Sequence, residues 1–508
     1  MNMNALNPSP RDKSPSRLSH LIALAAILLS AIVTFSHGRA IDPDFWGQLA
    51  FGKLIVESRG VPQADVYSYM PVKELWVNHE WGAAVIFHWI YKNFGGPGII
   101  WFKMIIWMSI TALCYSVCRR ENARPVHIIL VYFICFQDFF IGINSRPHLF
   151  TYLFFTVFLW AMSRYEKRPN LIFFLPLVNI LWANTHGGVA AGLGILGLFF
   201  LGNWYASGKI DFRTAAAIFL CLLTPLINPY GLNYYKYLLP AVLMDRWYIG
   251  EWRPLDLADF DILNNYKILL AIAALGMALL FERKKIHQYL IIIFSIYVSL
   301  KHVRHTPFFF ISAMAFLPGI LSNGGVSRFL DRDKFQSFMA KVPLTLRNIS
   351  ATAALLVLAL MFSLNSFVRR FSVDERIMDL VTPVSYKQGG GYVVPRMMVN
   401  KIRKLGLEGN IAVEFAWGEY IIWELGDRCR VSIDGRLETV YTRESIDAYF
   451  DFVNAREGRW RNLIDKYPTD MALIRVNCPV YEKMLQEKGW ELLSVYYDSA
   501  LFVRAKNK

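Results

Sequence analysis

The chain has 508 residues, 55% of them hydrophobic and 15% aromatic, and its mean hydropathy of +0.32 is too apolar for an ordinary soluble protein. Its formal net charge of +15 would suit a nucleic-acid-binding protein, but its Lys and Arg residues occur in short clusters between apolar runs, so we exclude nucleic acid as a partner. We expect an integral membrane protein in which these clusters determine the topology.

The first apolar run, 18–35, follows a basic tail, 1–17, that contains Arg11, Lys13 and Arg17. A secretory signal peptide has the same arrangement, but no small-x-small cleavage site follows this run, and the run is about long enough to cross a hydrocarbon core. We therefore predict a retained first helix and a cytoplasmic N-terminal tail.

Further apolar runs predict about eleven transmembrane helices in a domain that covers 18–366, with a large first extracytoplasmic loop at 36–97. The later runs are 98–118, 127–143, 148–163, 171–184, 188–205, 214–228, 265–281, 287–301, 306–322 and 349–366. The stretch 171–205 could instead form one long tilted helix. Two helices there place 19 Lys and Arg in six inside segments and only 6 in four short outside segments, which is the distribution that membrane insertion favours.

An acidic pair, Asp42 and Asp44, opens the first outer loop. A carboxylate at the membrane interface could act as a general base toward a hydroxyl acceptor, and its neighbour could equally bind a metal ion. Asp42 could instead cap an amphipathic helix that continues to about Ser58, with Pro43 at its first position. We keep both aspartates as catalytic candidates.

His79 and Glu80 precede a second amphipathic stretch, which extends to Phe94 in the same loop. We keep both residues as catalytic candidates. The alternative is a solvated start of an interfacial helix.

The outer ends of the later spans carry many ionisable and amide side chains. Such groups are costly near membrane depth, so their convergence on one face predicts a functional site. Guanidinium groups match phosphate oxygens, which favours a phosphate or diphosphate ligand, although lipid headgroups or an ion pair with a nearby glutamate would also satisfy the arginines. The predicted substrate-binding residues are Arg146, His148, Asn184, His186, Glu251, Arg253, His302, Arg304 and His305.

After the last span the chain becomes polar, passes a glycine linker at 389–391 and alternates β-like with helical segments. We predict a separate, small extracytoplasmic α/β domain over 367–508. Cys429 and Cys478 both fall in it, where a disulfide is permitted. The expected strands lie near 410–415, 430–434, 471–476 and 492–497.

The motifs at these positions resemble the polytopic GT-C glycosyltransferases, in particular poorly characterised bacterial members that have a C-terminal extracytoplasmic domain. The resemblance covers nearly the whole chain, with a mild departure at Phe45, where many related sequences have tryptophan. The matching stretches are Asp42-Pro43-Asp44-Phe45-Trp46, Trp76-Val77-Asn78-His79-Glu80-Trp81, Arg146-Pro147-His148-Leu149, Trp182-Ala183-Asn184-Thr185-His186-Gly187-Gly188, Asn228-Pro229-Tyr230-Gly231, Glu251-Trp252-Arg253-Pro254, Arg304-His305, Trp417-Gly418-Glu419-Tyr420 and Ile433-Asp434-Gly435-Arg436.

The resemblance implies an enzyme that moves a sugar from a polyprenyl-phosphate carrier to a glycan, lipid or protein acceptor on the outer face of a bacterial cytoplasmic membrane. Asp44 or Asp42 would deprotonate the acceptor, the anomeric carbon would invert, and the lipid phosphate would leave toward the predicted arginines. A divalent metal, Mg²⁺ or Mn²⁺, is compatible with this chemistry but not required by it. Trp417 and Tyr420 of the soluble domain could stack on the acceptor or belong to the core.

Two other functions stay open at this point. A transporter or flippase would also hold ionisable residues inside a helical bundle, although such proteins usually show inverted repeats and charges near the middle of their spans. A catalytically silent scaffold of an envelope polysaccharide system could keep the fold and use its soluble domain to bind partners.

Overall fold

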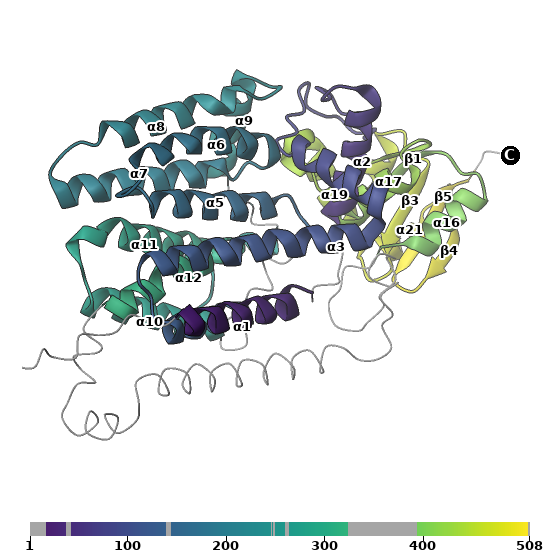
Figure 1. Cartoon of the computed structure of the whole chain (residues 1–508). Helices are drawn as coiled ribbons and strands as arrows, with labels where there is room; N and C mark the ends of the chain where they lie inside the picture. Colours follow the sequence, from purple (N-terminus) through teal and green to yellow (C-terminus); the bar gives the residue numbers. More distant parts are fainter. Residues whose placement is uncertain are drawn as a thin grey trace, which may run out of the picture.

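The computed structural model describes residues 17–36, 42–138, 144–244, 246, 249–259, 264–323 and 394–505. Figure 1 shows a bundle of long helices that run side by side, with a small sheet domain at one end of the bundle. The predicted last span at 349–366 and the glycine linker at 389–391 lie outside the described residues.

Helices occupy all the predicted spans that fall within the described residues. The bundle contains α1 (Arg17–Ser36), α3 (Trp81–Arg120), α4 (Pro125–Gln137), α5 (His148–Met162), α6 (Leu175–Thr185), α7 (Val189–Ser207), α8 (Phe212–Leu223), α9 (Leu232–Leu243), α10 (Asn264–Leu279), α11 (Ile286–Lys301) and α12 (Thr306–Asn323). Two helices, α6 and α7, cover most of 171–205, so this stretch is not one long helix, and whether both cross the membrane stays a prediction. The helix α9 was not predicted.

Three segments within the described ranges are long and apolar enough to cross a membrane: Trp81–Arg120, Val189–Ser207 and Val303–Ser322. Shorter apolar helices accompany them, among them α4, α5 and α10. The number of eleven spans therefore stays a prediction.

The helix α3 joins the amphipathic stretch that was expected to end at Phe94 to the next predicted span, in one element of 40 residues. Gly95 interrupts it with φ 61° and ψ −158°, a conformation that glycine adopts at low cost, and Pro97 follows. The first part of α3 packs along α2 (Asp44–Ser58), and the kink lets the rest continue through the bundle.

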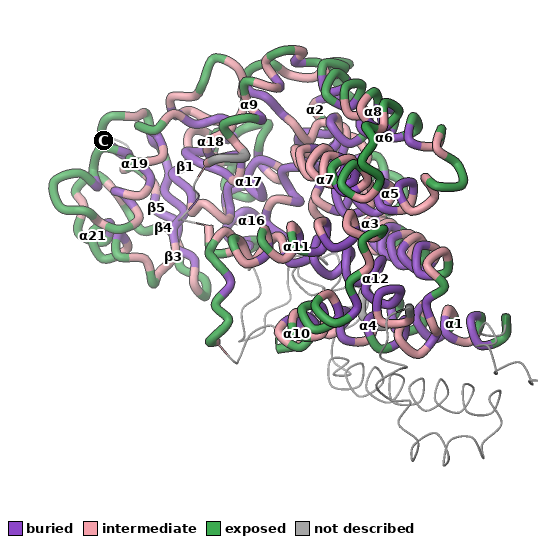
Figure 2. The backbone as a smooth tube through the Cα atoms, turned by 90° about the vertical axis from the view of Figure 1, so that its left-hand side faces the viewer, coloured by how far each residue is buried: buried purple, intermediate pink, exposed green. Residues whose placement is uncertain are grey.

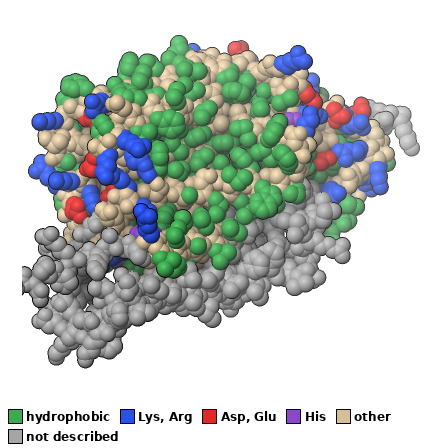
Figure 3. All heavy atoms as spheres, in the orientation of Figure 1, with side chains coloured by type: hydrophobic (Ala, Val, Ile, Leu, Met, Phe, Trp, Pro, Cys, Tyr) green, Lys and Arg blue, Asp and Glu red, His purple; other side chains and the backbone are tan. Residues whose placement is uncertain are grey.

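The surface of the bundle has the chemistry of a membrane protein. Large apolar side chains remain exposed on several helices, among them Trp101, Leu177, Phe219 and Leu275. Figure 3 shows hydrophobic side chains over the middle of the visible face, with charged side chains, Lys and Arg among them, gathered at its two ends. Contact with lipid removes the cost of exposing such a surface to water. The turns between α7 and α8 and between α10 and α11 lie at the end of the bundle farthest from the sheet domain (Figure 1), and which side of the membrane this end faces stays a prediction.

The C-terminal domain is built on a five-stranded mixed sheet of order β2-β1-β3-β5-β4. β1 is parallel to β2 and β3, and β5 is antiparallel to β3 and β4. Four strands lie near the predicted ranges, and β5, which was not predicted, follows β4 through a tight turn. The strands are β1 (Gly409–Val413), β2 (Cys429–Val431), β3 (Met471–Arg475), β4 (Trp490–Tyr496) and β5 (Ser499–Arg504).

Short helices surround this sheet, and its core is mainly apolar. Trp417 and Tyr420 are 1% and 2% exposed, so the alternative that both belong to the core is confirmed. Cys429 and Cys478 are free thiols, and the disulfide that was considered between them does not form. The helices are α16 (Arg396–Lys404), α17 (Gly418–Leu425), α18 (Leu437–Val440), α19 (Arg443–Val453), α20 (Asn462–Asp465) and α21 (Val480–Gln486).

The first outer loop and the C-terminal domain share one hydrophobic core. Phe45 and Trp46 of α2 belong to the same buried cluster as the sheet, and the Trp46 ring meets the Tyr420 ring edge-on at a centroid distance of 5.3 Å. Ser68 forms an isolated bridge with Val431 at the edge of β2. In Figure 2 buried backbone fills the centre of the sheet domain and continues into the helices beside it. The loop is thus an integral layer of the C-terminal domain.

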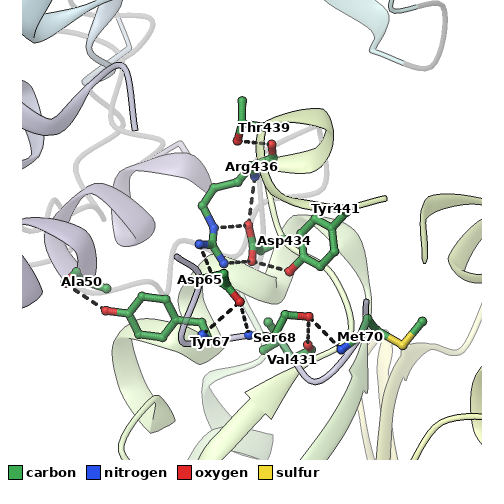
Figure 4. Close-up of polar contacts among 10 residues, drawn as sticks. All are labelled: Ala50, Asp65, Tyr67, Ser68, Met70, Val431, Asp434, Arg436, Thr439 and Tyr441. Atoms are coloured by element: carbon green, nitrogen blue, oxygen red, sulfur yellow. Dashed lines mark hydrogen bonds and ion pairs between the residues drawn. The ribbon is translucent and has the colours of Figure 1, made fainter. Parts of the chain in front are cut away.

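A buried ionic network ties these two parts together (Figure 4). The guanidinium of Arg436 donates to Asp65 Oδ1 at 2.6 Å and to Asp434 Oδ2 at 2.7 Å. The hydroxyl of Tyr441 donates to Asp434 Oδ2 at 2.6 Å. The side chains of Arg436, Asp65 and Asp434 are 5%, 1% and 0% exposed. We call these four residues the Arg436 network.

Candidate functional site

A cavity of about 580 Å³ lies where the bundle, the first outer loop and the C-terminal domain meet. Its volume is in the range of small-molecule sites. Three predicted site residues, Asp42, Asn184 and Arg253, do not line the cavity. The predicted residues that do line it are Asp44, His79, Glu80, Arg146, His148, His186, Glu251, His302, Arg304 and His305.

One arginine organises the acidic end of the cavity. Arg146, which precedes α5, places its Nε 2.6 Å from Asp42 Oδ1 and its Nη2 3.2 Å from Asp44 Oδ2. Its Nη1 donates to Glu251 Oε1 at 2.6 Å. A single guanidinium therefore faces three carboxyl groups, two from the start of α2 and one from the segment before α10, and its charge is already matched within the protein.

The two aspartates occupy different places. Asp42 Oδ1 accepts from the backbone N–H of Asp44 at 3.1 Å, and Pro43 has helical φ −52° and ψ −40°, so Asp42 caps α2 as the capping alternative predicted. The Asp42 side chain is 0% exposed, whereas that of Asp44 is 38% exposed and faces the cavity. Asp44 can touch a bound molecule, and Asp42 holds Arg146 behind it.

Burial and charge set the protonation of this end. Burial, with the Asp44 charge adding to it, raises the pKa of Asp42 to about 7 against the opposing effect of Arg146. Burial also raises the pKa of Asp44. Burial alone would raise the pKa of Glu251 too, but Arg146 and Arg304 outweigh it and hold this pKa at about 2. Glu251 is therefore the ionised partner of Arg146.

Glu80 lies on the same side, between two imidazoles. Its Oε1 is 3.5 Å from His186 Nε2 and 3.6 Å from His79 Nε2, and its Oε2 accepts from Gln48 Nε2 at 2.7 Å. Burial and the Asp44 charge raise the pKa of Glu80 to about 7, and burial lowers that of His79 to about 4. The imidazoles are thus neutral, and Glu80 can exchange a proton near neutral pH.

The tautomer of His186 follows from its backbone contacts. Its Nδ1 accepts from the N–H of Gly188 at 2.9 Å and lies 2.8 Å from Thr151 Oγ1. Because burial lowers the pKa of His186 well below its usual value, the ring is neutral and carries its proton on Nε2. That proton faces Glu80, so the predicted pair His79 and Glu80 gains His186 as a third member.

A basic and aromatic group forms another part of the cavity wall. The Arg304 guanidinium lies 4.7 Å from the centre of the Trp252 ring, and the Arg246 guanidinium lies 4.3 Å from it. Arg246 is neutralised by Glu438, whose Oε1 is 2.5 Å from its Nε. Among the described residues Arg304 has no ion pair, and it rests instead on the face of an aromatic ring.

Two predicted substrate-binding residues have other roles. Asn184 Oδ1 accepts from Trp81 Nε1 at 2.9 Å and from Asn228 Nδ2 at 3.1 Å, so it fastens the start of α3 to the turn before α9. Arg253 is exposed, and its backbone oxygen accepts from Val303 at 3.1 Å. Neither side chain reaches the cavity.

Several cavity residues were not predicted from the sequence. Glu419 and Arg436 belong to stretches that carried the family resemblance but received no role in the site, and they enter the cavity from the C-terminal domain. Arg246 and Glu438 line it with no motif around them. These four residues reach the cavity wall through contacts between segments that are distant in the sequence, so the sequence alone did not indicate them.

The cavity was also considered as a metal site. Within the described ranges no group of three or more His, Cys, Asp and Glu side chains is arranged to hold a metal ion. The divalent metal considered from the sequence stays a prediction.

Comparisons with known proteins concern the fold. No protein-family model matches the chain, and no curated protein matches its sequence. A cryo-EM structure of the arabinofuranosyltransferase AftD from Mycobacteria matches 97% of this chain with 13% identity and a TM-score of 0.57, and the match spans 40% of AftD. A crystal structure of the Archaeoglobus fulgidus oligosaccharyltransferase matches 91% of this chain with 10% identity and a TM-score of 0.58, and the match spans 70% of that enzyme. Both are GT-C fold members, and this chain has a GT-C-like fold.

Proposed function

We propose that the protein is a membrane glycosyltransferase that moves a sugar from a polyprenyl-phosphate-linked donor to an acceptor on the extracytoplasmic face of a bacterial cytoplasmic membrane. The observation that supports this proposal is that one cavity in a GT-C-like fold has both an acidic and a basic group on its wall. One part of the wall presents the carboxyl group of Asp44, and another presents the guanidinium of Arg304, which has no ion pair within the described residues. A base for an acceptor and a cation for a leaving phosphate are the two groups that this reaction needs.

The chemical step is a single displacement. The Asp44 carboxylate accepts the proton of the acceptor group while the acceptor atom forms a bond to the anomeric carbon of the sugar. The bond between that carbon and the phosphate oxygen breaks with its electron pair, and the configuration at the carbon inverts. The negative charge on the released lipid phosphate is stabilised by Arg304. Glu80 and the two imidazoles beside it assist on the acceptor side.

The apolar part of the cavity supports a lipid-linked donor. Phe294, Tyr297 and Val298 of α11 line it together with Ala190 and Ala191 of α7. Tyr297 is also 61% exposed. An apolar wall beside the phosphate site suits a polyprenyl chain whose phosphate enters the cavity.

The function is tested in cells that lack the gene and are complemented with the wild type or with an empty vector. We expect the empty vector to accumulate one polyprenyl-phosphate sugar and to lose one extracytoplasmic glycan, both measured by mass spectrometry of extracted lipids and envelope glycans. The accumulated species identifies the donor. Unchanged lipid-linked sugars and glycans in the deleted strain would overturn the transferase and favour a transport or scaffold role.

The phosphate site makes a separate prediction with a matched control. Arg304→Gln should weaken binding of undecaprenyl phosphate by roughly tenfold or more, because a charge-assisted hydrogen bond contributes about 1.5–3 kcal/mol. Binding is measured on the purified protein by native mass spectrometry over a lipid titration. Arg253→Gln removes an equal charge from an exposed position two residues after Glu251 and should leave the affinity unchanged. Equal losses in both variants would indicate a general electrostatic effect and contradict a specific site at Arg304.

A further inference from the structure

Glu419 is a buried carboxyl group without an evident partner. It lies in the first turn of α17, is 5% exposed, and lines the cavity. Its Oε2 is buried and accepts no hydrogen bond within the described part of the chain. A buried oxygen of this kind costs free energy unless a proton or a ligand satisfies it.

The backbone approaches Glu419 so closely at two positions that only glycine fits there. A Cβ added at Gly47 would lie 2.2 Å from Glu419 Oε2. A Cβ added at Gly435 would lie 2.7 Å from Glu419 Oε1 and 2.8 Å from Asp44 Oδ1. Two glycines, one from α2 and one from the loop before α18, thus allow two carboxyl groups from different parts of the fold to converge beside Gly435.

Nearby cations cannot neutralise Glu419. Arg436 faces it, but its guanidinium is bound to Asp434 and Asp65. The other charged groups that act most strongly on Glu419 are acidic, namely Asp44 of α2, Asp434, and Glu80 of the loop before α3, and Arg146 is already paired with Asp44. Two carboxylates that converge in a buried site, here Glu419 and Asp44, cannot both stay ionised at low cost.

We propose that Glu419 and Asp44 form a carboxyl pair that shares one proton, with the proton on Glu419, so that the C-terminal domain completes the acidic end of the cavity. Glu419 is then a positioning residue that keeps Asp44 ionised and oriented. The positioning role of Glu419 in sugar transfer rests on the proposed function. Its protonation is independent of that function. Burial and the charges of Asp44 and Asp434 raise the pKa of Glu419 well above its usual value, which agrees with the same assignment.

Infrared spectroscopy of the full-length purified protein tests the protonation directly. The difference spectrum between wild type and Glu419→Gln at neutral pH should contain the C=O stretch of a protonated carboxylic acid. Glu457→Gln, at an exposed position of the same domain, should remove only a carboxylate signal. A carboxylate signal in place of the acid signal for Glu419→Gln would overturn the proposal, whatever the protein transfers.

Thermal unfolding across pH gives a second readout. A carboxyl group whose pKa is raised by folding binds more protons in the folded state, so the wild type should lose stability relative to Glu419→Gln as pH rises from about 5 to about 9. Parallel stability curves for the two proteins would contradict a shared proton.

If the proposed function also holds, the pH dependence of sugar transfer separates positioning from packing. Wild-type transfer should decline at alkaline pH as Glu419 ionises, and Glu419→Gln should lack that decline while Glu419→Ala loses activity. Identical alkaline limbs in wild type and Glu419→Gln would exclude the positioning role.

Discussion

Asp44→Asn is expected to reduce sugar transfer by roughly 10²- to 10⁴-fold, the usual contribution of a general base. The amide has the shape of the carboxylate but cannot accept the proton of the acceptor. The measurement is conversion of the accumulated lipid-linked sugar by membranes that contain equal amounts of each variant. Asp447→Asn changes an exposed aspartate of α19, remote from the cavity lining, and serves as the matched control.

Asp42→Asn separates the two acidic positions. The Asn side chain can still cap α2 but no longer matches the charge of Arg146, so transfer should fall less than in Asp44→Asn.

Because burial raises the pKa of Asp44 and only its ionised form accepts a proton, wild-type transfer should also fall as pH drops through that raised pKa. Full activity of Asp44→Asn would rule out the assigned base.

Arg436→Met is expected to destabilise the protein by about 3–5 kcal/mol, the usual cost of leaving buried charges without their partner. Asp65 and Asp434 would remain buried, and the first outer loop would lose its main polar tie to the C-terminal domain. The measurement is thermal unfolding of the purified protein, with tryptophan fluorescence reporting the loss of tertiary structure.

Two further variants make this prediction specific. Arg443→Met breaks a surface pair between side chains that are 88% and 57% exposed, and it should leave the unfolding temperature almost unchanged. Combining Arg436→Met with Asp65→Asn and Asp434→Asn removes the unpaired charges and should restore part of the lost stability. Equal effects of Arg436→Met and Arg443→Met would show that the Arg436 network does not stabilise the protein.

The helices of the bundle could be predicted because membrane spans are encoded locally. A run of apolar residues of sufficient length, with basic residues at one end, is a property of a short window. The helix α9 escaped prediction because it contains Lys236 and Pro240 and is only 12 residues long. The break within α3 was predictable, because the amphipathic stretch was expected to end at Phe94 and the next span to begin at 98, and Gly95 between them has non-helical φ and ψ.

The acidic and basic character of the site was also predictable, but the roles of individual residues were not. Charged groups at one end of the spans indicate a site because lipid excludes them. Whether Arg253 or Arg304 faces the cavity depends on how the segments before α10 and α12 fold back on each other. Glu419 could not be assigned because its neighbours in space, Gly47 and Asp44, lie in a distant part of the chain.

The Arg436 network also constrains how the protein is made. Asp65 and Arg436 are 371 positions apart, so the first outer loop is synthesised long before its ionic partner exists. In a chain made from its N-terminus, Asp44 is synthesised early, whereas the wall that carries Glu419 and Arg436 is synthesised among the last residues. The cavity therefore cannot be complete until the C-terminal domain has been made and has packed against the first outer loop.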